Sequence, residues 1–288
     1  MNRFAFPAAL VGATFLMASS FIAGKILLAN VPPFALLGWR FLLAAVALAA
    51  IAAILSPKPN FAGLPARGWA VVSAIGVLQT AATMGCMFWA MQTVPPASVA
   101  ILAFTNPLWV ALANRLFFGE RLRAVQIAGL VCGVVGVALA LGGEFTLNPA
   151  ELIGLAAAFC WAGATILNQR MTPSLPSWWV SFGQTLIGAL LLLLLASLSG
   201  EQWPQQLSAV DWGWFVFLAI PGSAISFGLW FVALRMGGAT RASAWLFLAP
   251  AFTVLLSALI LGTPIRPTQA LGGVLIALAL WLVNRPLR

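Results

Sequence analysis

The sequence predicts an all-α integral membrane protein with ten transmembrane helices, arranged as two inverted five-helix repeats. Three observations lead to this prediction. Hydrophobic residues make up 62% of the 288 residues and charged residues only 7%. A soluble domain carries about 25% charged residues, so this chain has too few charges to cover a surface exposed to water. Ten apolar stretches follow one another, and the second five align with the first five.

Each apolar stretch is bounded by proline, glycine or charge, and each approaches the about 20 residues that a helix needs to cross a bilayer. The first stretch follows Arg3, as the apolar core of a signal peptide would. It is longer than such a core and more spans follow, so we expect it to be the first span. The expected spans are 5–28, 33–55, 68–91, 95–117, 124–142, 149–169, 177–197, 212–235, 239–261 and 267–283.

Basic residues set the expected orientation, because cytoplasmic loops of membrane proteins are enriched in Lys and Arg. With the N-terminus in the cytoplasm, 11 of the 14 basic residues fall at cytoplasmic ends and loops. Only Arg266 then falls in an outer loop, while Lys25 and Arg40 lie within the outer ends of spans. Both termini are therefore predicted to be cytoplasmic.

Composition also argues against several classes of function. The net charge of +9 would suggest nucleic acid in a soluble protein, but here the basic residues are scattered at the ends of apolar runs, so we expect no nucleic-acid partner. The three cysteines lie inside apolar runs without CxxC spacing, and the chain has no histidine. We therefore expect no metal site, no structural disulfide and no cofactor. An enzyme embedded in the membrane would need an acid–base set that the spans lack.

The two halves of the chain align with each other. The later part of each half aligns without a gap at an offset of 143 residues, which pairs Pro107 with Pro250. Nearer the start of each half the offset is 144 residues, which pairs Arg40 with Gln184. Because each half holds an odd number of spans, the second half enters the membrane in the opposite sense, as in many secondary transporters. The expected repeats are residues 1–143 and 144–288.

Short motifs accompany this repeat. The sequence GERL begins at Gly119, is preceded by NPL from Asn106 and is followed by QIAG from Gln126. Together with the paired segment from Ala249, these motifs resemble the EamA repeat of the drug/metabolite transporter superfamily. In the second copy Thr263 stands where the first has an acid, so any role of that acid is lost there. The resemblance implies an exporter of small metabolites in the bacterial inner membrane, with amino acids a common substrate class. The narrower resemblance is to YddG-type amino-acid exporters.

Polar residues near span centres predict a substrate site, because a polar side chain in a span is costly unless it faces protein or a water-filled cavity. Gln79, Thr83 and Met87 share one face of the third span. Thr83 corresponds to Ser226 and Met87 to Trp230 in the eighth span, so two related helices present a hydroxyl and a large apolar group at matching heights. The expected substrate contacts are Ser20, Lys25, Gln79, Thr83, Met87, Trp161, Thr165, Ser226, Trp230 and Trp245.

Other interpretations of these residues stay open. Ser and Thr often bond carbonyls of their own helix. Lys25 either attracts a substrate carboxylate or extends to the lipid headgroups, and for Arg40 extension to the headgroups is favoured. Trp161 and Trp230 are either walls of a pocket or bulk facing lipid.

The expected mechanism is alternating access, with Pro107 and Pro250 as hinges. No Asp or Glu lies near a span centre, which favours facilitated export or exchange over proton coupling. The expected substrate is a small metabolite, an aromatic or neutral amino acid first of all, carried by a monomer in the lipid bilayer. The alternatives are another solute class (drug, nucleoside or sugar derivative), a channel, or a structural membrane protein.

Overall fold

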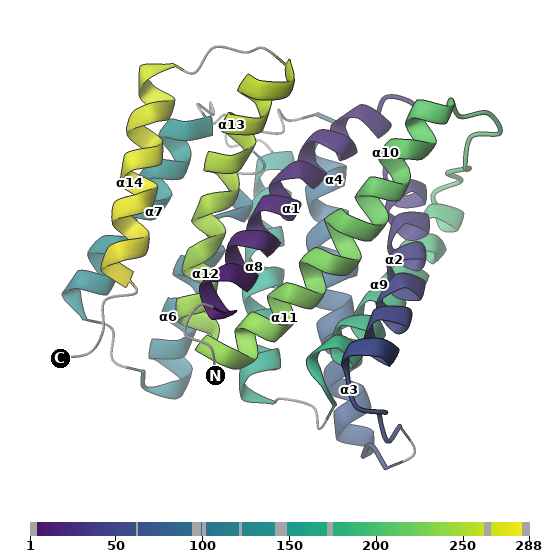
Figure 1. Ribbon diagram of the computed structural model, residues 1–288, viewed down its shortest axis with the longest axis horizontal. Coiled ribbons are helices and arrows are strands. Elements are labelled where there is room, and N and C mark those ends of the chain that lie inside the picture. Colours follow the sequence, from purple (N-terminus) through teal and green to yellow (C-terminus); the bar gives the residue numbers. More distant parts are fainter. Residues whose placement is uncertain are drawn as a thin grey trace.

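The computed structural model describes residues 5–61, 63–93, 99, 102–120, 123–141, 149–171, 175–261 and 266–283. Every regular element in these residues is helical (Figure 1). Seven continuous helical stretches there are long and apolar enough to cross a membrane, and two apolar helices are shorter. The predicted class, an all-helical protein of the membrane, is therefore confirmed. The number of ten spans and their inverted arrangement stay predictions.

The first half of the chain begins with two long helices, α1 (Ala5–Leu27) and α2 (Pro33–Leu55). The third expected span is α3 (Ala66–Ile75) and α4 (Thr83–Ala90), joined without interruption by a π-helical segment, η1 (Gly76–Ala82). The fourth expected span lies partly outside the described residues, and its described end is α6 (Asn106–Phe118). The half ends with α7 (Ala124–Leu141).

The second half repeats this order. Its helices are α8 (Pro149–Arg170), α9 (Ser177–Leu198), α10 (Ala209–Ala219), α11 (Ser226–Gly237), α12 (Ala239–Ala244), α13 (Leu248–Leu261) and α14 (Pro267–Val283). A second π-helical segment, η2 (Ile220–Ile225), joins α10 to α11 in one span. A 3₁₀ turn, η3 (Trp245–Phe247), joins α12 to α13. Pro32 precedes α2 and Pro176 precedes α9, and the repeat relates these two positions. Both prolines are in extended backbone, and a residue before a proline is disfavoured in the helical conformation. Each helix therefore begins directly after its proline.

The two π-helical segments occupy corresponding places in the third and eighth spans. At the end of η1 the hydroxyl of Thr83, the first residue of α4, donates to the carbonyl oxygen of Leu78 in η1 at 2.6 Å, five residues earlier. In η2 the Ser223 hydroxyl donates to the Leu218 carbonyl oxygen at 2.7 Å, again five residues earlier. These hydroxyls satisfy carbonyls where the wider turn disturbs the ordinary hydrogen-bond ladder. Pro221 lies within η2 and lacks the amide hydrogen that the ladder would need.

Corresponding helices also pack in pairs. α2 packs along α9, and α7 packs along α14 at the other edge of the bundle, while α1, α8 and α11 lie between these pairs (Figure 1). Glycines let α7 and α14 approach closely: a Cβ added at Gly136 would lie 2.9 Å from the carbonyl oxygen of Gly272. α1 begins and α14 ends at the same end of the bundle (Figure 1). This is what an even number of crossings requires.

Candidate binding site

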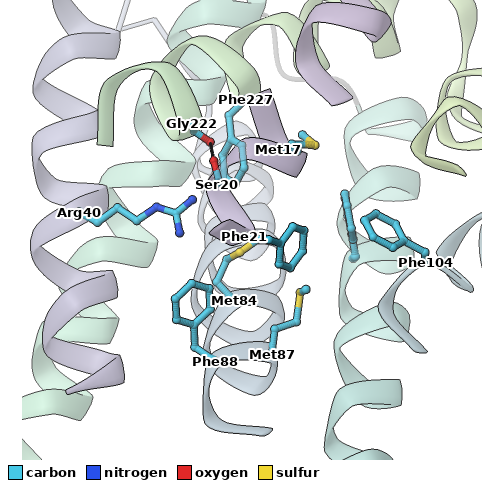
Figure 2. Close-up of a pocket in the computed structure, with 11 residues that line it drawn as sticks. Met17, Ser20, Phe21, Arg40, Met84, Met87, Phe88, Phe104, Gly222 and Phe227 are labelled. Carbon is cyan, nitrogen blue, oxygen red and sulfur yellow. Dashed lines mark hydrogen bonds between the residues drawn. The ribbon is translucent and has the colours of Figure 1, made fainter. Parts of the chain in front are cut away.

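A cavity lies inside the bundle between α1, α2, α4, α8, η2 and α11 (Figure 2). Its walls come from both halves of the chain, and most of its side chains are aromatic or methionine. The described lining residues are Met17, Ser20, Phe21, Arg40, Met84, Met87, Phe88, Phe104, Trp161, Gly222 and Phe227.

The cavity is narrow in this conformation. The empty space between the lining side chains amounts to ≈ 460 Å³, including the part that opens outward, but only ≈ 30 Å³ admits the centre of a water-sized sphere. One water needs about 10–15 Å³ on that measure, so the space corresponds to about two water molecules. A larger solute binds here only if side chains or helices move apart.

Arg40 supplies the positive charge of the cavity. Its side chain is 3% exposed, and its Nε donates to the Ser223 hydroxyl at 2.7 Å. The guanidinium carbon lies 4.7 Å from the ring centroid of Phe41 and 5.8 Å from that of Phe88. Aromatic faces attract a guanidinium, which offsets part of the cost of burying it. No carboxylate is found among the described lining residues.

The structure gives the two cations within spans different surroundings, and it corrects the interpretation favoured for Arg40. Arg40 does not extend to the headgroups, because it turns inward from α2 to meet η2 (Figure 2). Lys25, in contrast, is exposed at the end of α1 and does not line the cavity. One signal in the sequence pointed to Arg40: its repeat partner Gln184 is also polar, and a position that stays polar in both halves favours a contact inside the protein.

Ser20 and Gly222 form a close contact between α1 and η2. The Ser20 hydroxyl has two carbonyl oxygens within hydrogen-bonding distance, Leu16 at 2.8 Å and Gly222 at 3.0 Å. The Ser226 hydroxyl also donates to the Gly222 carbonyl oxygen, at 2.7 Å. A Cβ added at Gly222 would lie 2.2 Å from Oγ of Ser20, so a larger residue here would force the Ser20 side chain or α1 to shift.

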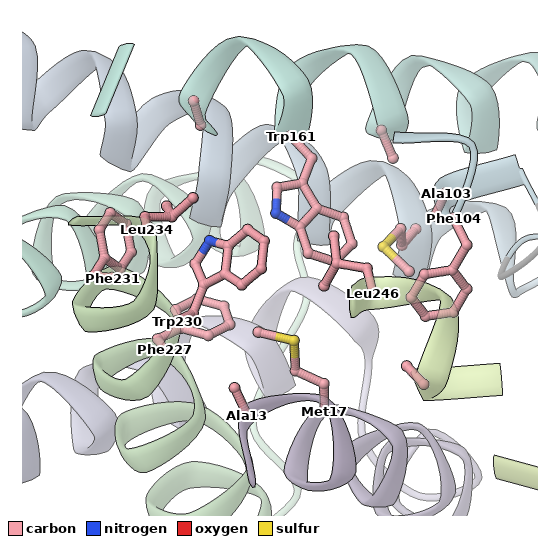
Figure 3. Packing of buried hydrophobic residues seen from close by; sticks show 14 of the residues in the cluster. Ala13, Met17, Ala103, Phe104, Trp161, Phe227, Trp230, Phe231, Leu234 and Leu246 are labelled. Carbon is pink, nitrogen blue, oxygen red and sulfur yellow. The ribbon is translucent and has the colours of Figure 1, made fainter. Parts of the chain in front are cut away.

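Aromatic rings continue from the cavity into the bundle (Figure 3). The ring centroid of Trp161 lies 6.3 Å from that of Phe104 and 6.2 Å from that of Trp230. Both tryptophans are buried, which excludes the lipid-facing interpretation. Their indole N–H groups have no hydrogen-bond partner among the described residues. Buried donors are seldom left unpaired in proteins, so these groups suit a site that water or a solute completes.

The predicted contacts fall into two groups. Ser20, Met87 and Trp161 line the cavity. The others do not line it, and their role as substrate contacts stays a prediction. In this second group Lys25 is exposed, and the hydroxyls of Thr83 and Ser226 donate to carbonyl oxygens of their own spans. The remaining four each have a buried side-chain nitrogen or oxygen without a hydrogen-bond partner among the described residues: Gln79, Thr165, Trp230 and Trp245.

Sequence reasoning missed most of the apolar lining. Met84, Phe88, Phe104 and Phe227 look like any other apolar residue in an apolar span, because nearly every position there is hydrophobic. Met84 and Phe88 could have been found from their helical spacing around Met87. The others depend on how helices from distant parts of the chain meet.

The two predicted hinge prolines lie next to breaks in their spans. Pro107 is in the first turn of α6, directly after a turn at 104–105. Pro250 is in the first turn of α13, and Leu246, four residues earlier, lies in the 3₁₀ turn η3. Proline disturbs the helix at the carbonyl four residues before it, which accounts for this break. Their action as hinges stays a prediction.

A polar cluster joins three helices at the end of the bundle where α1 begins. Arg170 forms an ion pair with Glu120 and donates to the Asn114 side-chain oxygen at 3.2 Å. The Asn114 side-chain nitrogen donates to the Thr240 hydroxyl at 3.1 Å and approaches the Gln169 oxygen at 3.5 Å. The cluster therefore links the ends of α6 and α8 to the start of α12. The position corresponding to Glu120 in the second half, Thr263, lies outside the described residues.

Comparisons with known proteins give one consistent family. The EamA-like transporter family matches the chain twice, over residues 7–142 and 148–285. The uncharacterized transporter YoaV of Bacillus subtilis (strain 168) is 23% identical, over 95% of this chain and 94% of its own. A probable amino-acid metabolite efflux pump of Salmonella typhimurium (strain LT2) is 27% identical, over 91% of this chain and 89% of its own. One crystal structure shares the fold, with a TM-score of 0.82 at 23% identity, covering 98% of this chain and 97% of that one.

Proposed function

Because this chain belongs to the EamA-like transporter family, we propose that it is a secondary transporter of the bacterial inner membrane that exports small metabolites by alternating access. The observation that carries the proposal is the central cavity, whose walls come from both family-matched segments. A site between two repeats is where secondary transporters bind their substrates. The division into repeats 1–143 and 144–288, the ten spans and the cytoplasmic termini are part of this proposal.

The chemistry of the cavity favours a small amphipathic solute, and we propose neutral or aromatic amino acids. Methionine and phenylalanine side chains adapt to apolar groups of different shape. Arg40 and the Ser20 hydroxyl provide the few polar contacts that orient a ligand in a mainly apolar pocket. The relative from Salmonella named as a probable amino-acid metabolite efflux pump supports the same class. Relatives named as transporters also fit a protein that is not an enzyme.

Facilitated export or exchange fits the site better than proton coupling. The described lining holds no carboxylate that could take up a proton. One acid, Glu151, is buried, but it lies in the first turn of α8, at an end of its span. Negative charge at a helix N-terminus is stabilised by the helix dipole, so this acid has a structural explanation.

Reconstituted protein tests the proposal. We expect proteoliposomes to take up labelled L-phenylalanine and L-leucine saturably, and internal unlabelled amino acid to accelerate the uptake by exchange. An imposed pH gradient should change the rate little. Strict dependence on the gradient would contradict the uncoupled mechanism, and flux that does not saturate would indicate a channel.

A further inference from the structure

The two halves of the protein make the same contact twice, but with different side chains. On one side Nε of Arg40 in α2 donates to the Ser223 hydroxyl in η2 at 2.7 Å. On the other side the Thr80 hydroxyl in η1 donates to Oε1 of Gln184 in α9 at 2.7 Å. Arg40 and Gln184 are related by the offset of 144, and Thr80 and Ser223 by the offset of 143. A helix is thus joined to a π-helical segment by a polar side chain in both halves, once with a neutral amide and once with a charge.

This comparison indicates that packing does not require the charge of Arg40. Gln184 is fully buried. Its side-chain oxygen accepts from Thr80 and its side-chain N–H donates to the Thr185 hydroxyl at 2.7 Å, so both ends of the amide have a partner within the protein. Arg40 uses only Nε in its contact, and its two terminal nitrogens have no hydrogen bond to a described residue. These nitrogens point into the cavity (Figure 2). A buried charge with unpaired donors is costly, and a ligand that pairs with them relieves that cost.

The surroundings of the guanidinium select the kind of ligand. The described lining has no acid, so a cationic solute would be repelled by Arg40 without compensation. A carboxylate accepts two parallel hydrogen bonds from a guanidinium, which matches the two free terminal nitrogens. Arg40 is also the only cation in the described lining, which fits one negative charge rather than the two of a phosphate monoester. The neighbouring side chains of Met84, Phe88 and Phe227 suit an apolar group beside the carboxylate.

We propose that Arg40 is the receptor for the carboxylate of the transported solute, and that substrates are therefore monocarboxylates with a neutral, apolar side chain. This inference rests on the transport function proposed above and adds the group that is recognised. Cationic drugs and uncharged solutes such as nucleosides and sugars fall outside this class.

Matched ligands and matched variants test the proposal. The variant Arg40→Gln places at this position the residue that its repeat partner already carries, so the contact with Ser223 can be kept. Binding of L-phenylalanine and L-leucine, and of their amides, is measured on purified protein by calorimetry, with flux measured in proteoliposomes. Arg266→Gln removes the same charge from an exposed site at the start of α14 and serves as the control.

The wild-type protein is expected to bind the amino acids in preference to their amides. In Arg40→Gln the affinity for the amino acids should fall by about 10- to 100-fold, the range expected for lost hydrogen bonds to a charged group, while binding of the amides does not weaken. Arg266→Gln should behave like the wild type. Arg40→Lys keeps the charge without the planar fork, so an intermediate loss is expected, and this variant carries the test if Arg40→Gln does not fold.

Two results would overturn the proposal while leaving transport intact: a folded Arg40→Gln protein that binds the amino acids as tightly as the wild type, or a wild-type protein that does not distinguish acids from amides. If the wild-type protein showed no saturable flux of any solute tested, that result would instead contradict the proposed transport function, and this inference with it.

Discussion

Single residues shape the cavity partly through the groups that they lack. Gly222 has no side chain, and this allows Ser20 to reach its carbonyl oxygen from α1. The residue that corresponds to Gly222 in the first half is Gln79, which is buried and fills its position. The repeat is therefore similar in its helices but asymmetric at this site, because Gly222 lines the cavity and Gln79 does not.

Adding one methyl group at Gly222 tests this account. Gly222→Ala would place a Cβ 2.2 Å from Oγ of Ser20, so we expect a loss of about 1–3 kcal/mol in unfolding free energy, together with reduced transport. Gly213→Ala is the control, because a Cβ there meets no atom within 4 Å, and alanine favours a helix by up to about 1 kcal/mol. Thermal unfolding in detergent distinguishes the two variants. Equal stability would show that the α1–η2 contact adapts easily.

The indole of Trp161 is expected to form a wall for the substrate. Trp161→Ala removes a ring that touches the cavity, and we expect the apparent affinity for solute to fall by about tenfold, or about 1.4 kcal/mol, while the protein still inserts into the membrane. Trp281→Ala, in α14, removes an indole that is 56% exposed and should leave transport unchanged. Concentration dependence of uptake provides the measurement. If both variants transported equally well, Trp161 would be a packing residue only.

At the scale of elements, the two π-helical segments and the polar cluster at one end have different roles. η1 and η2 widen the turn at corresponding places, which places Thr80 and Ser223 against α9 and α2. The cluster of Asn114, Glu120 and Arg170 joins helix ends instead. If the proposed alternating access separates these helix ends, the second kind of contact breaks, whereas the residues of the first are buried deep in the bundle.

Breaking the ion pair between Arg170 and Glu120 is expected to change the rate of solute exchange more than the stability of the fold. The side chains of Arg170 and Glu120 are 30% and 36% exposed, and such exposed pairs contribute about 0–1 kcal/mol. Glu120→Gln should leave the unfolding temperature nearly unchanged and raise the exchange rate by about two- to fivefold, because the linked helix ends lose one of their contacts. Lys58→Gln, at an exposed site, is the control. An unchanged exchange rate would show that this end does not limit transport.

At the scale of the whole molecule, hydropathy and proline predicted most helices closely. The second span was expected at 33–55 and α2 is Pro33–Leu55; the last was expected at 267–283 and α14 is Pro267–Val283. These ends are local properties of the chain. The π-helical segments, the inward turn of Arg40 and the approach of Phe104 to Trp161 depend on contacts between distant helices, and no local pattern contains them.

Topology gives the test at this scale. With ten crossings and the basic residues inside, both chain ends should be cytoplasmic. A fluorescent protein that folds only in the cytoplasm should then be active at either terminus. Alkaline phosphatase, active only outside, should report from fusions within 28–32 and 199–206. Termini on opposite sides would require an odd number of crossings and would remove the inverted repeat.

The narrowness of the cavity also affects whether protons can leak across the membrane through the protein. A space for about two waters, beside a guanidinium, cannot hold the continuous file of water along which protons hop across a membrane. Fixed positive charge in a pore adds an electrostatic barrier to hydronium and to sodium. In this conformation the cavity therefore provides no file of water along which protons could cross between the two halves of the protein.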